Sequence, residues 1–181
     1  MSSTAVVLVL ASGKGERFIA SGGTGSKLQA MLAGKPVLER TLDAVRSSGL
    51  AWHLEDAGHD GMGDSIAAAV RATQDATGWL VLPGDLPLIQ PESLRSVAAA
   101  LAHANVVLPD FQGQRGHPVG FSAACRDALL ALTGAQGAAS VVRECSAVRP
   151  PTQLVLDDPG IVTDIDTVQD LAAAQALLQR R

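Results

Sequence analysis

The chain has 181 residues, of which 47% are hydrophobic and 3% aromatic, and its formal net charge is −4. This size and composition predict a single domain, residues 1–181, with a core of aliphatic side chains. The acidic balance argues against a nucleic-acid-binding protein, and the apolar run Ala5–Ala11 is too short for a membrane span or a signal peptide. We therefore expect a cytoplasmic protein. Cys125 and Cys145 lack metal-ligand spacing and are expected to be buried free thiols.

Strands and helices alternate along the chain. The continuous Val/Leu run Ala5–Leu10 predicts a strand buried on both faces, and a helix is expected from Pro36 until Gly49 ends it. Further extended segments are expected at residues 51–54, 79–82, 106–108, 119–121, 153–156 and 162–165. Further helices are expected after a cap at Asp64 or Ser65, at residues 91–103, 123–132 and 138–145, and from the capping box at Thr167 to Arg181.

This alternation predicts the α/β class, with a mostly parallel, Rossmann-like sheet flanked by helices on both faces. Three polar loops follow buried strands: Ser12–Lys27, Asp60–Asp64 and Gly84–Pro87. Open α/β sheets bind ligands at the carboxyl ends of their strands, so we expect these loops to converge on one site.

The first of these loops contains five glycines together with the cations Lys14, Arg17 and Lys27. Backbone N–H groups in such a loop can approach phosphate oxygens without interference from a Cβ atom. It is not a dinucleotide fingerprint, because Phe18 occupies the third glycine position. It is not a Walker A loop either, because Gly25-Ser26-Lys27-Leu28 stands where Gly-Lys-Ser/Thr is required. The loop predicts another type of polyphosphate site, with a solvated surface loop as the alternative.

Carboxylates follow two other predicted strands. Asp85 emerges from a buried strand, where an unpaired carboxylate is costly, and it suits Mg²⁺ held jointly by protein carboxylates and substrate phosphates. A turn-capping role is the alternative. Asp164 and Asp166 would share one face of an extended segment. If Asp166 instead caps the last helix, Asp164 is the better metal candidate.

Together these segments resemble the molybdenum cofactor cytidylyltransferase family of the small nucleotidyltransferase superfamily. The matching segments follow the family order from Ala5 to about Leu171. They are Leu8–Phe18, Lys27-Leu28, Gly34–Arg40, Gly61–Ile66, Pro83–Pro87, Gly116–Phe121 and Asp164–Thr167.

The resemblance implies transfer of CMP from CTP to the terminal phosphate of a molybdopterin-type acceptor, with Mg²⁺ as cofactor and release of pyrophosphate. A molybdoenzyme could then receive the product. The acceptor phosphate is already largely ionised at pH 7, so the reaction needs no general base. By comparison with related enzymes that use GTP, Ser12 and the stretch Gly61-Met62-Gly63 favour CTP.

The resemblance also assigns roles to individual residues. It implies catalytic roles for Lys27, Arg17 and Asp85, and a metal site made by Asp85, Asp164 and Asp166. The implied nucleotide site comprises Ala11, Ser12, Gly13, Lys14, Gly15, Arg17, Lys27, Gly61, Met62, Gly63, Ser65 and Asp85. The implied acceptor site comprises Gly116, His117 and Pro118.

The chain departs from the family pattern in three places. One β-α unit is missing between Ser47 and Asp60, and the loop before Lys27 carries the extra residues Ile19–Gly25. Ala135 and Ala139 stand where the family tends to have a carboxylate and a cation. Two other functions therefore stay open: a nucleotidyltransferase that uses GTP or a sugar phosphate, and a non-catalytic molybdenum-cofactor-binding chaperone.

Overall fold

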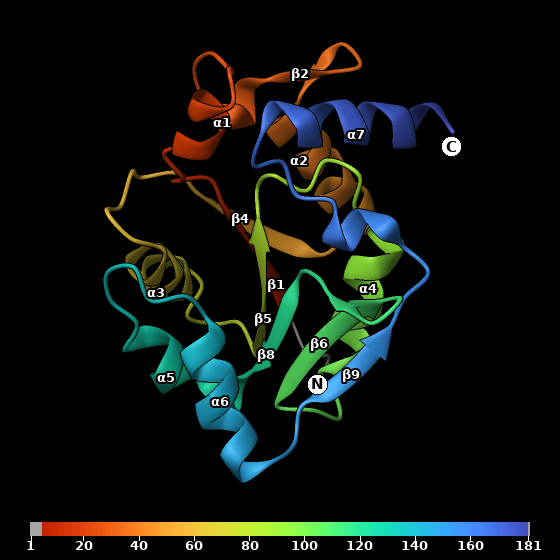
Figure 1. Cartoon of the computed structure of the whole chain (residues 1–181). Coiled ribbons are helices and arrows are strands. Elements are labelled where there is room, and N and C mark those ends of the chain that lie inside the picture. The colour runs from red at the N-terminus through yellow and green to blue at the C-terminus, as the bar shows by residue number, and fades with distance from the viewer. Residues whose placement is uncertain (1–4, 181) are drawn as a thin grey trace.

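One mixed, mostly parallel sheet forms the centre of the computed structural model, which describes residues 5–180 (Figure 1). Its strand order is β4-β1-β5-β8-β6-β7, with β9 beside β6. β1 pairs in parallel with β4 and β5, β9 pairs in parallel with β6, and β8 and β7 are antiparallel to their neighbours. The strands are β1 (Ala5–Leu10), β4 (Ala51–Glu55), β5 (Gly78–Pro83), β6 (Val106–Phe111), β7 (Gln114–Arg115), β8 (Val119–Ser122) and β9 (Thr152–Val155).

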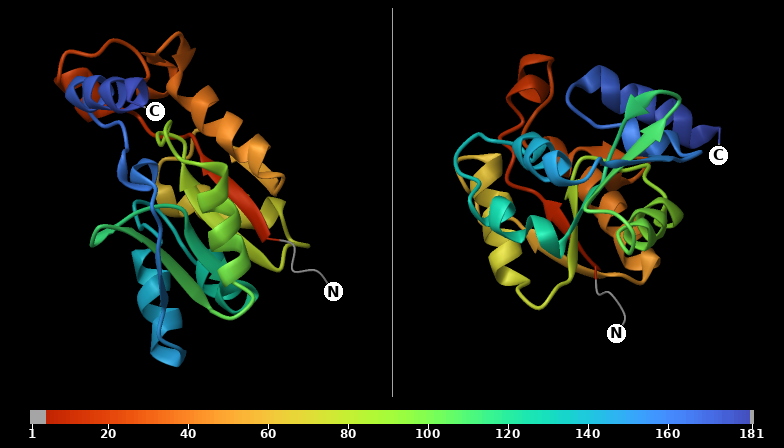
Figure 2. Two further views of the ribbon diagram at one scale, coloured as in Figure 1. Left: turned by 90° about the vertical axis from the view of Figure 1, so that its right-hand side faces the viewer. Right: turned by 90° about the horizontal axis from the view of Figure 1, so that it is seen from below.

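Helices cover both faces of this sheet, as the sequence predicts (Figure 2). One face packs on α2 (Val37–Ser48) and α4 (Pro91–Ala100); the other packs on α3 (Met62–Ala72), α5 (Arg126–Leu130) and α6 (Ala139–Val148). The split follows the period-two alternation of strands: Leu80 and Leu82 belong to the first core cluster, and Trp79 and Val81 to the second. Both faces of β5 are therefore buried, which is why its sequence is continuously apolar.

A third group of elements lies over the carboxyl ends of β1 and β5 (Figures 1 and 2). It consists of α1 (Glu16–Ala20), the 3₁₀ helix η1 (Lys27–Gln29), the hairpin of β2 (Met31–Leu32) and β3 (Lys35–Pro36), and α7 (Val168–Gln179). Phe18 of α1, Leu32 of β2 and Ala174 of α7 share one small core with Ile165. The glycine-rich segment is therefore anchored to the C-terminal helix.

Several sequence predictions are confirmed. Thr167 and Asp170 form the predicted capping box of α7, and Cys125 and Cys145 are buried free cysteines. Between α2 and α3 the structure has only β4, in agreement with a missing β-α unit. None of the helices within residues 5–180 is long and apolar enough to cross a membrane. Met1–Thr4 of the predicted domain and the predicted helix end at Arg181 lie outside the described residues.

The predicted start of the helix after β4 was wrong. Neither Asp64 nor Ser65 caps α3, which begins at Met62 with Gly61 as its N-cap residue. The cap comes from another part of the chain, because the Gly63 N–H donates to the carbonyl of Gly134 at 2.9 Å. A distant carbonyl cannot be recognised from the local sequence.

Other boundaries also need correction. Residues 162–165 are not a strand, since the 3₁₀ helix η3 (Pro159–Val162) leads directly into irregular chain. The helix from Pro91 ends at Ala100, before the predicted His103, and residues 123–132 divide into the 3₁₀ helix η2 (Ala123–Cys125) and α5. Residues 12–27, predicted to be a loop, contain the short helix α1. Its N-cap residue, Gly15, has a left-handed backbone conformation with φ 64°.

Replacing Gly160 by alanine is expected to lower the free energy of unfolding by about 1–3 kcal/mol. An added Cβ at this residue of η3 would lie 2.1 Å from the Leu88 carbonyl oxygen, so backbone would have to move. Gly13→Ala is the control, because nothing lies within 4 Å of a Cβ there. Urea denaturation of both variants measures the difference, and an equal effect would contradict this account of the packing.

Candidate active site

The structure brings the three predicted loops together around a cleft of about 380 Å³ at the carboxyl ends of β1, β4 and β5. Its lining residues are Leu10, Ser12, Gly13, Lys14, Glu16, Lys27, Leu28, His59, Asp60, Gly61, Met62, Ser65, Pro83, Gly84 and Asp85. A second hollow of about 280 Å³ adjoins it, lined by Gly13, Lys14, Gly15, Glu16, Arg17, Lys27 and Asp166. Because four residues line both hollows, one elongated ligand can occupy the two together.

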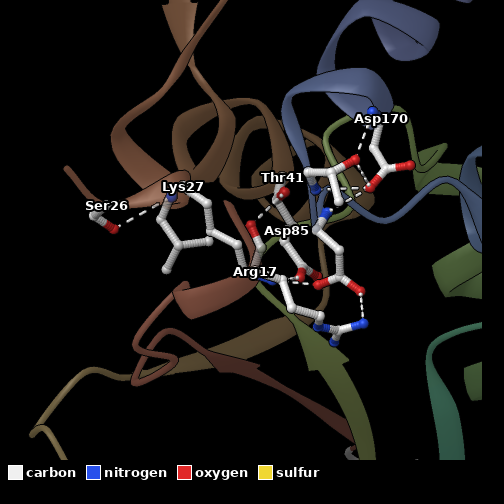
Figure 3. Close-up of polar contacts among 10 residues, drawn as sticks. Arg17, Ser26, Lys27, Thr41, Asp85 and Asp170 are labelled. Atoms are coloured by element: carbon white, nitrogen blue, oxygen red, sulfur yellow. Dashed lines mark hydrogen bonds and ion pairs between the residues drawn. The ribbon is translucent and has the colours of Figure 1, made fainter. Parts of the chain in front are cut away.

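An ammonium group held between two carboxylates lies where the two hollows meet. Lys27 Nζ lies 2.6 Å from Asp85 Oδ2 and 2.9 Å from Asp166 Oδ1. Arg17 Nη1 binds the other oxygen of Asp166 at 2.9 Å. Figure 3 shows Arg17, Lys27 and Asp85 converging from separate elements. Burial works to lower the pKa of Lys27, but the two carboxylates outweigh it and the pKa is raised, so the lysine stays charged.

Backbone contacts fix Asp85 from both sides. The hydroxyl of Thr41, a fully buried residue of α2, donates to the Gly84 carbonyl at 2.9 Å, and Gly84 N–H donates to Leu10 O at 2.9 Å. The Ile165 N–H donates to the Asp85 carbonyl at 3.0 Å. The last bond ties the loop after β5 to the segment that carries Asp166. The two carboxylates are thus positioned by the same backbone framework.

Asp166 is held in place by the start of α7. The N–H groups of Asp166 and Thr167 both donate to the carboxylate of Asp170, at 3.1 and 2.7 Å. Thr167, not Asp166, caps the helix, so the alternative capping role of Asp166 was wrong. Asp164 lies at the surface, with its carboxyl only partly shielded from solvent. This shielding is the main reason that the pKa of Asp164 is raised, and the negative charges of Asp85, Asp166 and Asp170 raise it further.

The carboxylates offer suitable oxygen ligands for a divalent cation. Asp85 is 8% exposed, and among the described residues its Oδ1 has no hydrogen-bond partner. Within residues 5–180, no group of three or more His, Cys, Asp or Glu side chains is arranged to hold a metal ion. A hard cation bound to Asp85 and Asp166 would therefore take its remaining ligands from substrate phosphate or water, as Mg²⁺ commonly does.

The residues predicted to bind nucleotide do not all reach the surface of the two hollows. Ser12, Gly13, Lys14, Gly61, Met62 and Ser65 line the larger cleft, and Gly15 and Arg17 line the second hollow. Ala11 instead donates its N–H to Glu55 O, and Gly63 packs against the backbone of Thr133. The Ser65 hydroxyl donates to the carbonyl of Gly61, the N-cap residue of its own helix, at 3.2 Å.

None of the three predicted acceptor residues lines either hollow. Gly116 and Pro118 are buried, and His117 N–H donates to Ile161 O at 2.9 Å. Burial lowers the pKa of His117, against the opposing influence of the Asp85 charge and a hydrogen bond with the Val81 carbonyl. The role of Gly116, His117 and Pro118 in acceptor binding stays a prediction.

Sequence reasoning missed one part of the site, a buried glutamate that binds two histidines. Glu55, at the end of β4, is 6% exposed and contacts His53 and His59. His59 also lines the larger cleft. Strand alternation puts His53 and Glu55 on the same face of β4, which is the signal that could have revealed this pair. His59 follows in the loop, where no periodicity applies.

Comparison with known sequences identifies one family. A model of the MobA-like NTP transferase domain matches residues 44–148, more than half of the chain. The chain is also similar to bifunctional protein GlmU of Alcanivorax borkumensis, with 32% identity over 123 residues. That match covers 56% of this chain and 26% of GlmU, so the chain spans about a quarter of the length of this relative.

Solved structures share the fold at low identity. A nucleotidyl transferase from Methanothermobacter thermautotroptrophicus superposes with a TM-score of 0.81 and 19% identity, covering 99% of both chains. Rv0371C from Mycobacterium tuberculosis H37Rv, in complex with manganese, superposes with a TM-score of 0.74 and 20% identity, covering 96% of this chain and 98% of that one. Molybdopterin-guanine dinucleotide biosynthesis protein A from Archaeoglobus fulgidus superposes with a TM-score of 0.63 and 18% identity, covering 97% of this chain and 100% of that one.

The depressed pKa of His117 predicts a loss of stability in mild acid. A histidine that the fold keeps neutral takes up its proton more readily in the unfolded chain, so the free energy of unfolding falls as pH drops below about 6.5. We expect the free energy of unfolding to decrease between pH 7 and 5.5 in urea titrations. His117→Gln should flatten this slope, and an unchanged slope in that variant would contradict the assignment.

Proposed function

Because the chain belongs to the MobA-like NTP transferase domain family, we propose that it transfers CMP from CTP to the terminal phosphate of a molybdopterin-type acceptor. Pyrophosphate is the second product, and Mg²⁺ is the cofactor. The observation that carries the proposal is the meeting of Lys27, Asp85 and Asp166 at the junction of two hollows, beside the glycine-rich segment. This arrangement can hold a polyphosphate and a divalent cation at one point.

The two hollows suggest how CTP lies in the site. The smaller one combines Lys14, Arg17 and Lys27 with the backbone of Gly13 and Gly15, so it suits the triphosphate. The larger cleft continues from these cations to the segment 59–65, and its volume of about 380 Å³ suits a nucleoside. The α-phosphate then lies near Asp85, where the two hollows meet.

The proposed reaction exchanges one phosphoryl bond for another. An oxygen of the acceptor phosphate attacks the α-phosphorus of CTP, and the bond from this phosphorus to the oxygen that bridges to the β-phosphate breaks. Pyrophosphate leaves with that electron pair. Lys27 and Arg17 would stabilise the negative charge that the two anions bring together. When bound at Asp85 and Asp166, Mg²⁺ would supply further charge neutralisation and orient the phosphates.

Specific similarities favour other substrates as second candidates. The match to GlmU proteins favours a sugar-phosphate nucleotidyltransferase. The structural similarity to molybdopterin-guanine dinucleotide biosynthesis protein A favours a guanine nucleotide. A cofactor-binding chaperone without transfer activity is the non-enzymatic alternative, prompted by Ala135 and Ala139. Delivery of the product to a molybdoenzyme and a cytoplasmic location belong to the main proposal.

A substrate panel distinguishes these functions. Each reaction contains the protein, Mg²⁺, one of the four NTPs and one acceptor. The acceptor is either molybdopterin carrying molybdenum or a sugar 1-phosphate. Pyrophosphate release and the adduct mass are measured. We expect pyrophosphate and a CMP adduct in equal amounts only with CTP and the molybdopterin acceptor. A GMP or sugar adduct would favour a second candidate, and nucleotide binding without pyrophosphate would favour the chaperone.

Asp85→Asn tests the proposed catalytic carboxylate. The substitution keeps the shape of the side chain and removes its charge, so kcat should fall by at least about 100-fold with little change in the folded structure. Asp43→Asn is the matched control, because this exposed aspartate of α2 pairs with Lys35 outside both hollows. Equal activity of the two variants would remove Asp85 from the mechanism.

Lys27→Met should change the affinities for metal and nucleotide in opposite directions. The Lys27 ammonium now neutralises Asp85 and Asp166, so its removal should let nucleotide-free protein bind Mn²⁺ about tenfold more tightly. Loss of the same charge should weaken CTP binding. Calorimetric titrations with Mn²⁺ alone and with CTP alone measure the two effects, with Lys35→Met as control. Weaker Mn²⁺ binding in Lys27→Met would contradict the proposed metal site.

A further inference from the structure

The glutamate–histidine cluster at the end of β4 is not used by the proposed reaction. Glu55 Oε2 contacts His53 Nε2 at 3.1 Å, and Glu55 Oε1 contacts His59 Nε2 at 3.1 Å. Burial works to raise the pKa of Glu55, but hydrogen bonds from the histidines and from the Ala57 N–H outweigh it and the pKa is lowered. Glu55 is therefore an ionised, buried carboxylate that orients two imidazole rings.

The two histidines differ in where they lie. Each side chain is 29% exposed, but His59 lines the larger cleft and His53 lies on β4. Glu55 is also tied to the start of the glycine-rich segment, because its carbonyl accepts the Ala11 N–H at 2.9 Å. If the triphosphate lies among Lys14, Arg17 and Lys27, as proposed, the base would lie in the part of the larger cleft that residues 59–62 line. In the proposed binding mode His59 would therefore lie next to the nucleobase.

The carboxylate also determines the tautomer of His59. An ionised carboxylate only accepts hydrogen bonds, so the proton of the neutral His59 ring must be on Nε2. Nδ1 then carries a lone pair and can only accept. An amino group on a nucleobase can donate to this nitrogen, whereas a carbonyl oxygen in the same position would place two lone pairs against each other. The ring therefore favours cytosine, with its 4-amino group, over uracil, which has a 4-carbonyl group.

We propose that His59 is a specificity-determining residue that accepts a hydrogen bond from the 4-amino group of cytosine, and that Glu55 is its positioning residue. This assignment rests on the proposed function, because it needs the triphosphate to lie among the cations of the glycine-rich segment. It adds a residue that distinguishes CTP from UTP. Such discrimination arises because the wrong base covers a polar group of the site without pairing with it.

Calorimetric titration of CTP and UTP tests this role in the wild type and in His59→Ala, His53→Ala and Glu55→Ala. We expect His59→Ala to weaken CTP binding about tenfold with little change for UTP, so that the ratio of the two Kd values approaches one. Glu55→Ala should lower the ratio similarly, and adding it to His59→Ala should change nothing more. Glu55→Gln, which can still accept at Oε1, should preserve much of the selectivity and covers the case that Glu55→Ala does not fold.

His53→Ala is the matched control, because His53 binds the same carboxylate at the same distance and lies on β4. It should keep the wild-type ratio of Kd values. A wild-type ratio in His59→Ala, or an equal loss in His53→Ala and His59→Ala, would overturn the assignment. If the wild-type protein transfers CMP but His59→Ala keeps the wild-type selectivity, this inference is wrong and the proposed function still holds. Wild-type protein that neither binds CTP nor transfers CMP overturns the proposed function with it.

Discussion

Lys27, Asp85 and Asp166 come from three distant parts of the chain, and their charges can be tolerated at low exposure only because they meet. Removing one partner would leave the others partly buried without compensation. The fold therefore has to hold three segments in fixed relative positions: the loop after β5, the segment before α7 and the start of η1. The elements over the carboxyl ends of β1 and β5 provide much of this support.

The supporting contacts form one connected framework. Thr41 holds the loop of Asp85 against α2, and Ile165 joins that loop to the segment of Asp166. Asp170 fixes Asp166 while it completes the capping box of α7. The core of Phe18, Leu32 and Ala174 then holds α1 and α7 over the sheet. Stability and site geometry are coupled here, because the same bonds contribute to both.

Local signals in the sequence predicted the sheet, most helices and the three converging loops. Buried parallel strands such as β1 and β5 require apolar residues on both faces, and the capping box at Thr167 is a short-range pattern. Contacts between distant segments were not predictable in this way. The Gly134 carbonyl starts α3 two residues before Asp64, and Glu55 organises His59 from the end of another element. Asp166, rather than Asp164, contacts Lys27 because the chain at 162–165 is irregular.

A crystal structure with Mn²⁺ and a non-hydrolysable CTP analogue tests the central claim most directly, because the anomalous signal locates the ion. The account predicts Mn²⁺ bound by Asp85 and Asp166, with the Lys27 ammonium moved from the carboxylates to the triphosphate. An ion bound elsewhere, with the Lys27 contacts to Asp85 and Asp166 intact beside bound nucleotide, would contradict it.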